Sequence, residues 1–267
     1  MSAEHRAKPW SDCGIWEGEG LRREVFFFRS GGVDLYGSLY APASLEPRLG
    51  VLLCNSWGFE GDLASRLLYP LALSVAEAGG AAVVFHYPGF GDSDGDLGAV
   101  TMEVLAESAV DALRESARRQ ACGEWVLAGA MLGASVASIA AGGQSVARRL
   151  LLVQPALRPA KYFARLERAS RRSSGGLASK ERFAFGYPLT GAMLDSAARA
   201  DDAVATALAG FHGDGAAVRH SAPSVIEGLP EGFAQVCAEG TWRFGTGKFT
   251  GLLDASARHL RSLVAGA

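Results

Sequence analysis

The sequence predicts an α/β fold built on a mostly parallel sheet, with an antiparallel N-terminal hairpin and a short helical cap. Two short apolar runs, 50–54 and 81–85, have the composition of strands buried on both faces of a parallel sheet. Segments of helical character follow each run. A third apolar run, 125–128, ends in a glycine-rich turn before a helix of small residues.

Length and composition favour one domain over residues 1–267. A hydrophobic content of 49% in 267 residues is enough for a single large α/β core. We interpret residues 1–20 as an irregular N-terminal arm and about 156–204 as the cap insertion, because the strand and helix pattern changes there. No internal repeat or low-complexity linker interrupts the chain.

The charge pattern gives no reason to expect nucleic acid or a membrane as partner. The formal net charge is −2, and no apolar run approaches the roughly 18–20 residues of a membrane span. The basic segment 165–172 is interpreted as a solvated helix face rather than an anion site. Without a signal-peptide pattern, a cytoplasmic protein is expected, and its oligomeric state, monomer or homo-oligomer, is left open.

The cysteine pattern indicates neither a metal cluster nor a redox motif. The four cysteines are far apart and form no CxxC pair. The aspartates of 92–96 fit turns better than a calcium loop, because the closing glutamate of that loop is missing. We therefore expect no metal and no cofactor.

The first half of the chain alternates strands and helices. Residues 31–32 are a Gly-Gly turn between two strand-like runs, as in an antiparallel hairpin. Residues 55–62 are interpreted as a polar, glycine-rich loop, with Asp62 as the N-cap of the next helix. The expected strands are 23–30, 33–40, 50–54, 81–85, 125–128 and 150–154, and the expected helices are about 63–78, 102–120 and from the elbow to about 147.

The second half is less regular. A helical piece is expected near 186–200, and 216–220 and 224–227 are weak strand candidates. Residues 233–238 make a better strand, and the apolar spacing of 252–264 predicts a closing helix.

The motifs resemble the α/β-hydrolase superfamily. Residues 129–133 (GAMLG) resemble its G-x-S-x-G nucleophile elbow, and 86–96 (HYPGFGDSDGD) resemble its D-x-R-G-x-G-x-S loop. The resemblance covers about 24–155. It is closest to the serine-aminopeptidase-like branch of small esterases, acyl-thioesterases and exosortase-associated hydrolases. His86 and Pro88 depart from it, standing where the branch has Asp and Arg.

The resemblance implies a Ser-His-Asp triad, but two of its members are missing. Met131 stands at the nucleophile position, and a thioether cannot form an acyl-enzyme. The histidine should lie within 239–251, which contains none. Of the histidines elsewhere, only His212 and His220 fall where they could face the pocket, and a structural or surface role is expected for His259. Three aspartates are available as the acid, and none can be assigned: Asp201, Asp202 and Asp214.

The oxyanion hole is expected to survive, because it is made of backbone N–H groups. Its donors would be Leu132 and the Ser56-Trp57 segment. Met131 would be an apolar floor beneath a bound carbonyl or a filler of the core, and both interpretations stay open.

Three further side chains near this site are candidates for catalysis. Ser56 either binds a ligand or caps its loop, with neither interpretation preferred. For Cys54 an inert buried thiol is favoured over a nucleophile. For His86 altered loop packing is favoured over a new base.

The favoured hypothesis is a protein that binds a small-molecule or carrier-linked acyl or carbonyl substrate and has lost hydrolysis. It would be a biosynthetic enzyme that performs a non-covalent step such as proton transfer, isomerisation or elimination. The alternatives are an esterase or thioesterase with a displaced nucleophile, and a binding or accessory protein without turnover. Candidate substrate-binding residues are Ser56, Trp57, Met131 and Leu132, and the candidate catalytic side chains are His86, His220 and Ser56.

Overall fold

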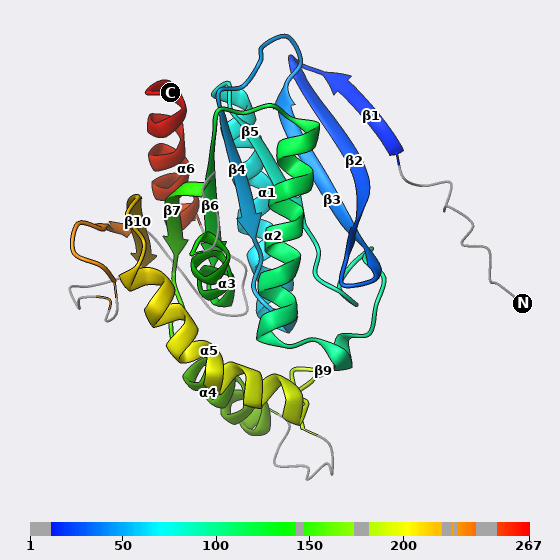
Figure 1. Ribbon diagram of the computed structural model, residues 1–267, viewed down its shortest axis with the longest axis vertical. Coiled ribbons are helices and arrows are strands. Elements are labelled where there is room, and N and C mark those ends of the chain that lie inside the picture. The colour runs from blue at the N-terminus through cyan, green and yellow to red at the C-terminus, as the bar shows by residue number, and fades with distance from the viewer. Residues whose placement is uncertain (1–11, 143–146, 174–181, 221–225, 227–228, 239–249) are drawn as a thin grey trace, which may run out of the picture.

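A computed structural model describes residues 12–142, 147–173, 182–220, 226, 229–238 and 250–267. In this part of the chain the main sheet has nine strands in the order β1-β2-β3-β5-β4-β6-β7-β10-β11 (Figure 1). The first three strands are antiparallel, and the strands from β5 to β11 are parallel to one another. The strands are β1 (Asp12–Gly18), β2 (Leu21–Ser30), β3 (Val33–Pro42), β4 (Leu49–Cys54), β5 (Ala81–Phe85), β6 (Glu124–Ala130), β7 (Ala147–Val153), β10 (Asp214–His220) and β11 (Ala234–Ala238).

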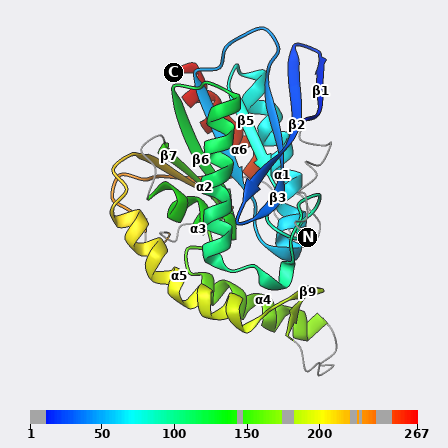
Figure 2. The same cartoon turned by 45° about the vertical axis from the view of Figure 1, so that its right-hand side comes forward.

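Helices cover both faces of the sheet. α1 and α6 contribute to one buried apolar cluster, and α2 and α3 to the other. α4 and α5 cross one end of the sheet, next to α3 (Figure 2). The helices are α1 (Gly58–Glu77), α2 (Met102–Arg119), α3 (Leu132–Ala141), α4 (Pro159–Ser173), α5 (Gly191–Ala209) and α6 (Thr250–Ala265), with a 3₁₀ turn at Leu97–Ala99 and a small hairpin, β8 (Phe183–Ala184) and β9 (Tyr187–Pro188), between α4 and α5.

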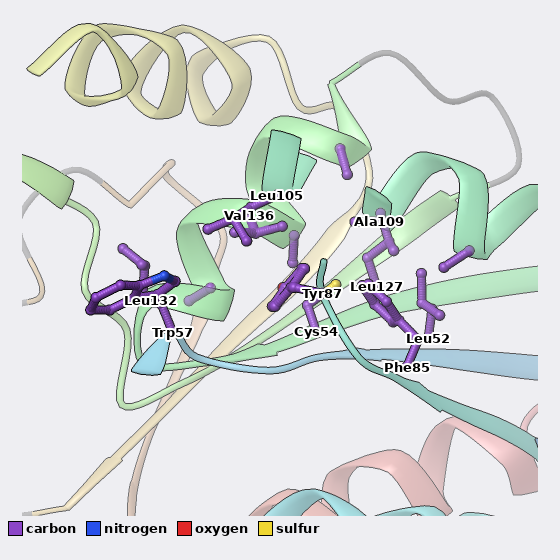
Figure 3. Close-up of a cluster of buried hydrophobic side chains, with 14 of the residues drawn as sticks. Leu52, Cys54, Trp57, Phe85, Tyr87, Leu105, Ala109, Leu127, Leu132 and Val136 are labelled. Carbon is purple, nitrogen blue, oxygen red and sulfur yellow. The ribbon is translucent and has the colours of Figure 1, made fainter. Parts of the chain in front are cut away.

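The central strands are apolar throughout because both of their faces are covered. Every residue of β4 and of β5 is buried. Successive side chains of a strand point to opposite faces, so Leu52 and Cys54 join the cluster under α2 and α3 while Val51 and Leu53 join the other. Figure 3 shows the first of these clusters, with Leu52, Cys54 and Leu127 side by side in it.

The turn between β6 and α3 has the tight backbone that the elbow motif predicts. Met131 lies at φ 54° and ψ −118°, a strained conformation for a residue other than glycine. Its N–H donates to Val153 O at 2.9 Å, and its carbonyl accepts from Ala156 N–H at 3.0 Å. These two hydrogen bonds connect the turn to β7 and to the segment after it, and they fix the strained backbone of Met131.

Several elements differ from the sequence predictions. Part of the expected irregular arm, Asp12–Gly18, is strand β1, paired with β2. α1 begins at Gly58 rather than at 63, so its N-cap is Trp57 and not Asp62. α3 ends at Ala141, well before 147, and α5 runs to Ala209. The weak candidate strand 224–227 lies almost entirely outside the described residues.

The predicted cap region folds as α4, the β8-β9 hairpin and α5, which lie along the end of the sheet where α3 begins (Figure 2). Phe163 is fully buried among aromatic rings, with Trp57 at 5.4 Å and Tyr162 at 5.1 Å between ring centroids. The cap is therefore packed onto the sheet end rather than standing away from it.

Candidate functional site

A cavity of about 290 Å³ lies between the elbow and the first two turns of α4. Met131 forms part of its wall, and the segment after β7 forms another part. This volume is near the lower limit of small-molecule pockets. Its lining residues are Glu60, Met131, Gln154, Pro155, Ala156, Leu157, Arg158, Lys161, Tyr162, Arg165 and Ile226.

Glu60 is the acidic residue of this wall. It stands in the first turn of α1, only 1% exposed, and its Oε1 accepts from Arg165 Nη2 at 2.8 Å. Its Oε2 is also buried and has no hydrogen-bond partner among the described residues. A buried oxygen of a carboxylate is costly to leave unpaired. The carboxylate is thus almost wholly covered by the side chains around it, of which Arg165 and Tyr162 interact with it.

Burial raises the pKa of the Glu60 carboxyl, although Arg165 and the Tyr162 hydroxyl both act to lower it. A carboxyl whose pKa is raised holds a proton more readily than an ordinary glutamate, as a general base requires. The geometry therefore offers a candidate general base, and the sequence analysis did not identify it.

The same shift predicts how Glu60 affects stability. Folding raises the pKa of the Glu60 carboxyl above its unfolded value of about 4.3. The stability that the neutral carboxyl contributes is therefore fully present below about pH 4.3 and is lost as the pH rises through the folded pKa. In Glu60→Gln this side chain no longer titrates. We expect its free energy of unfolding to fall less between about pH 4 and 8 than that of the wild type. Urea denaturation across that range measures both slopes, and equal slopes would contradict the shift.

Ser56 is engaged inside the protein. Leu132 N–H donates to Ser56 Oγ at 3.3 Å, and the Ser56 hydroxyl lies 3.1 Å from the Tyr162 hydroxyl. The Ser56 N–H donates to the side-chain oxygen of Asn55 at 2.8 Å. Two of the backbone donors expected in an oxyanion hole are therefore already used. A carbonyl oxygen would have to displace the Ser56 hydroxyl to reach Leu132 N–H.

Of the four predicted substrate-binding residues, only Met131 lines the cavity. Ser56, Trp57 and Leu132 are each no more than 2% exposed. Figure 3 shows Trp57 and Leu132 as parts of the apolar cluster that also holds Cys54. Cys54 is fully buried, and burial raises the pKa of its thiol far above the ordinary value, which suits the predicted inert role.

His86 lies outside the cavity wall and has partners of its own. Its ring stacks on Tyr36 at 4.7 Å between centroids, and its Nε2 is 3.0 Å from the Tyr69 hydroxyl. Its Nδ1 accepts from Asp92 N–H at 3.3 Å, which places the ring proton on Nε2. Burial lowers the pKa of the His86 imidazole, and the negative charge of Asp92 offsets only part of this shift. The side chain therefore acts as a neutral connector between β3, α1 and the loop after β5.

The other histidine and aspartate candidates whose side chains are described do not line the cavity. His212 lies beside Arg148 and Asp214 in a separate hollow at the opposite, amino ends of β6, β7 and β10, so the expectation that it could face the pocket is wrong. His259 is in α6, and the side chain of His220 lies outside the described part. Asp201 accepts from Ala160 N–H at 3.0 Å and pairs with Arg158 at 3.3 Å, so it anchors the start of α4.

Comparisons with known proteins show the fold. No family model and no curated protein matches the chain. Among solved structures, an alpha-beta serine hydrolase homologue from Coxiella burnetii matches at TM-score 0.57 and 16% identity, covering 90% of this chain and 96% of that one. Est1E from Butyrivibrio proteoclasticus with bound ferulic acid matches at TM-score 0.62 and 13% identity (90% and 98%). A putative hydrolase from Agrobacterium vitis matches at 0.61 and 18% (91% and 99%).

The chain therefore has the α/β-hydrolase fold, with Met131 at the elbow position. No helix among the described residues is both long and apolar enough to span a membrane. In the same part of the chain, no three His, Cys, Asp or Glu side chains are grouped so as to hold a metal ion.

Proposed function

We propose that this protein binds a small acyl or carbonyl compound, free or carrier-linked, in the cavity beside Met131 and transfers a proton on it without an acyl-enzyme. The observation that carries the proposal is the buried Glu60 carboxylate, with one unpaired oxygen, in the wall of that cavity. Solved structures of this fold include proteins described as esterases and hydrolases, which supports an acyl or carbonyl compound as the ligand.

The elbow supports a non-covalent reaction. Met131 occupies the nucleophile position in the strained conformation of the motif, yet its thioether has no proton to give up. The Met131 side chain is 4% exposed and supplies an apolar part of the cavity wall.

Glu60 would accept the proton. Arg165 holds Oε1 and so orients the carboxylate, and a side chain of the cavity wall would move to let a ligand reach the buried Oε2. When Oε2 takes a proton from a carbon next to a carbonyl, the electron pair moves to the carbonyl oxygen. Tyr162 and Lys161 belong to the same cavity wall and are candidate donors to that oxygen. Return of the proton to another atom completes an isomerisation, and loss of a leaving group completes an elimination.

One observation favours a second candidate, an esterase with Ser56 as displaced nucleophile. The Ser56 hydroxyl is 3.1 Å from that of Tyr162, which in turn interacts with Glu60, so a path for the serine proton is present. Against this, Ser56 is 1% exposed, does not line the cavity and already accepts from Leu132 N–H. We therefore place it second.

Hydrogen exchange in deuterium oxide tests the proposal. The protein is incubated with a panel of small ketones, oxo acids and acyl thioesters, and loss of the signal of the proton next to the carbonyl is followed by NMR. We expect protein-dependent exchange for at least one compound class. Binding without exchange or any other turnover would favour the accessory-protein alternative. Ester or thioester hydrolysis that Ser56→Ala abolishes would favour the second candidate.

A further inference from the structure

The outer side of β1 is an open edge of the main sheet. β1 is the first strand in the order and pairs with β2 on one side, and no strand of the described residues pairs with its other side (Figure 1). Five large apolar side chains are exposed in the described part of the chain, and two of them are neighbours here, Ile15 at 61% and Trp16 at 56%. An edge strand with exposed apolar side chains is a template for pairing with another strand.

The hairpin turn after β1 determines which of its backbone groups point outward. Residues 19–20 both have positive φ, as in a two-residue type I′ turn, in which the residues on either side form a hydrogen-bonded pair. Hydrogen-bonded and non-hydrogen-bonded pairs then alternate along the antiparallel ladder. The even-numbered residues of β1 therefore bond to β2, and the backbone N–H and C=O groups of Ile15 and Glu17 point away from it.

The regular part of β1, residues 14–18, has Trp16 at its centre. An irregularity in the pairing with β2 separates this part from Asp12. Because side chains alternate between the two faces of a strand, the residues that flank Trp16 on its own face are both glycines, Gly14 and Gly18. The indole lies over Gly18, where a Cβ would be 2.6 Å from the ring. This face therefore presents one large ring with bare glycine backbone on both sides of it.

We propose that β1 pairs in antiparallel orientation with β1 of a second copy of this chain, with the two Trp16 side chains opposite each other at the two-fold axis. Ile15 of each copy then faces Glu17 of the other, and the outward N–H and C=O groups of these residues bond to one another. Gly14 faces Gly18, so the backbone leaves room for both indoles.

The pattern of β1 favours a second copy over an unrelated strand because it is self-complementary, as a two-fold interface requires. Its outward hydrogen-bonding residues lie symmetrically about Trp16, and so do its glycines. No like charges face each other, since Glu17 lies opposite Ile15. The inference does not depend on the proposed function, because β1 is at the edge of the sheet, whereas Met131 and the cavity follow β6 and β7.

The oligomeric state tests the proposal. Sedimentation velocity over a range of protein concentrations should show a monomer–dimer equilibrium. Trp16→Glu should raise the dissociation constant of the dimer about 30-fold or more, because it removes a central aromatic side chain and places two carboxylates opposite each other. Leu45→Glu is the matched control, since Leu45 is 64% exposed but follows β3, and it should dimerise as the wild type does. Thermal melting checks that both variants are folded.

Disulfide crosslinking tests the register. In Trp16→Cys the two new thiols belong to a directly opposed, non-hydrogen-bonded pair with Cα atoms about 4.5 Å apart, which a disulfide can span. In Ile15→Cys they are diagonal neighbours about 7–8 Å apart, beyond its usual reach. Both variants also carry Cys13→Ser and Cys237→Ser, so that neither of these thiols forms the crosslink.

We expect oxidation to give a covalent dimer of Trp16→Cys and little of Ile15→Cys. The proposal would be overturned by a wild type that is monomeric at every concentration, or by a dimer that Trp16→Glu leaves unchanged. It would also be overturned if Trp16→Cys crosslinked no more than Ile15→Cys.

Discussion

Replacing Glu60 by glutamine is expected to slow protein-dependent hydrogen exchange by about 10²- to 10⁴-fold, the usual contribution of a positioned base. Glutamine keeps the size of the side chain and can still accept from Arg165, so the cavity wall stays in place. It cannot accept a proton at the position of Oε2. NMR exchange rates in deuterium oxide, measured on the compound that the wild type processes, give the ratio directly.

Two comparisons separate this effect from a general loss of structure. Glu77→Gln removes an exposed carboxylate from the same helix, α1, and should leave the rate unchanged. The pH profile of the wild type should fall on the acidic side at a pH above the ordinary pKa of a glutamate, because burial raises the pKa of Glu60. A Glu60→Gln protein as active as the wild type would remove Glu60 from the mechanism.

Replacing Gly133 by alanine is expected to destabilise the fold by about 3 kcal/mol, the upper end for an overpacked position. A Cβ on Gly133 would lie 2.2 Å from the carbonyl oxygen of Cys54 and 2.4 Å from that of Asn55. These are backbone atoms of β4 and of the residue after it, so no side chain can move aside. The melting temperature should fall by about 6–12 °C.

Gly191→Ala is the matched control for this prediction. Gly191 also lies in the first turn of a helix, α5, and a Cβ there would meet no atom within 4 Å. Alanine should leave stability unchanged or raise it by up to about 1 kcal/mol, because glycine is a poor helix former. If both variants lost a similar amount of stability, the close approach of Gly133 to the carbonyl oxygens of Cys54 and Asn55 would not explain why position 133 is a glycine.

The sheet could be predicted because its signals are local. Strands β4 and β5 are short apolar runs whose residues are all buried, and the glycine pattern of 129–133 marks a turn that allows no Cβ at two positions. Each of these features is contained within a few neighbouring residues. The resemblance implied the fold class, and the structural comparisons confirm the fold.

The cavity could not be predicted because it depends on contacts between distant segments. Glu60 stands in a stretch that was interpreted as a polar loop, and its burial requires Arg165, which lies 105 positions later in the chain. Ser56 likewise meets Tyr162 across 106 positions. The one local signal for the site was the glutamate itself, four residues after Ser56. The glycines on both sides of it do not favour a helix, so the sequence did not indicate that α1 begins at Gly58.

The central claim is that no serine of this protein acts as an acylated nucleophile, and a fluorophosphonate probe tests it most directly. The protein is incubated with excess probe, and its intact mass is measured alongside an active serine hydrolase. We expect no increase in mass for the wild type. A stoichiometric adduct on a serine, lost in Ser56→Ala or mapped to another serine by peptide analysis, would contradict it.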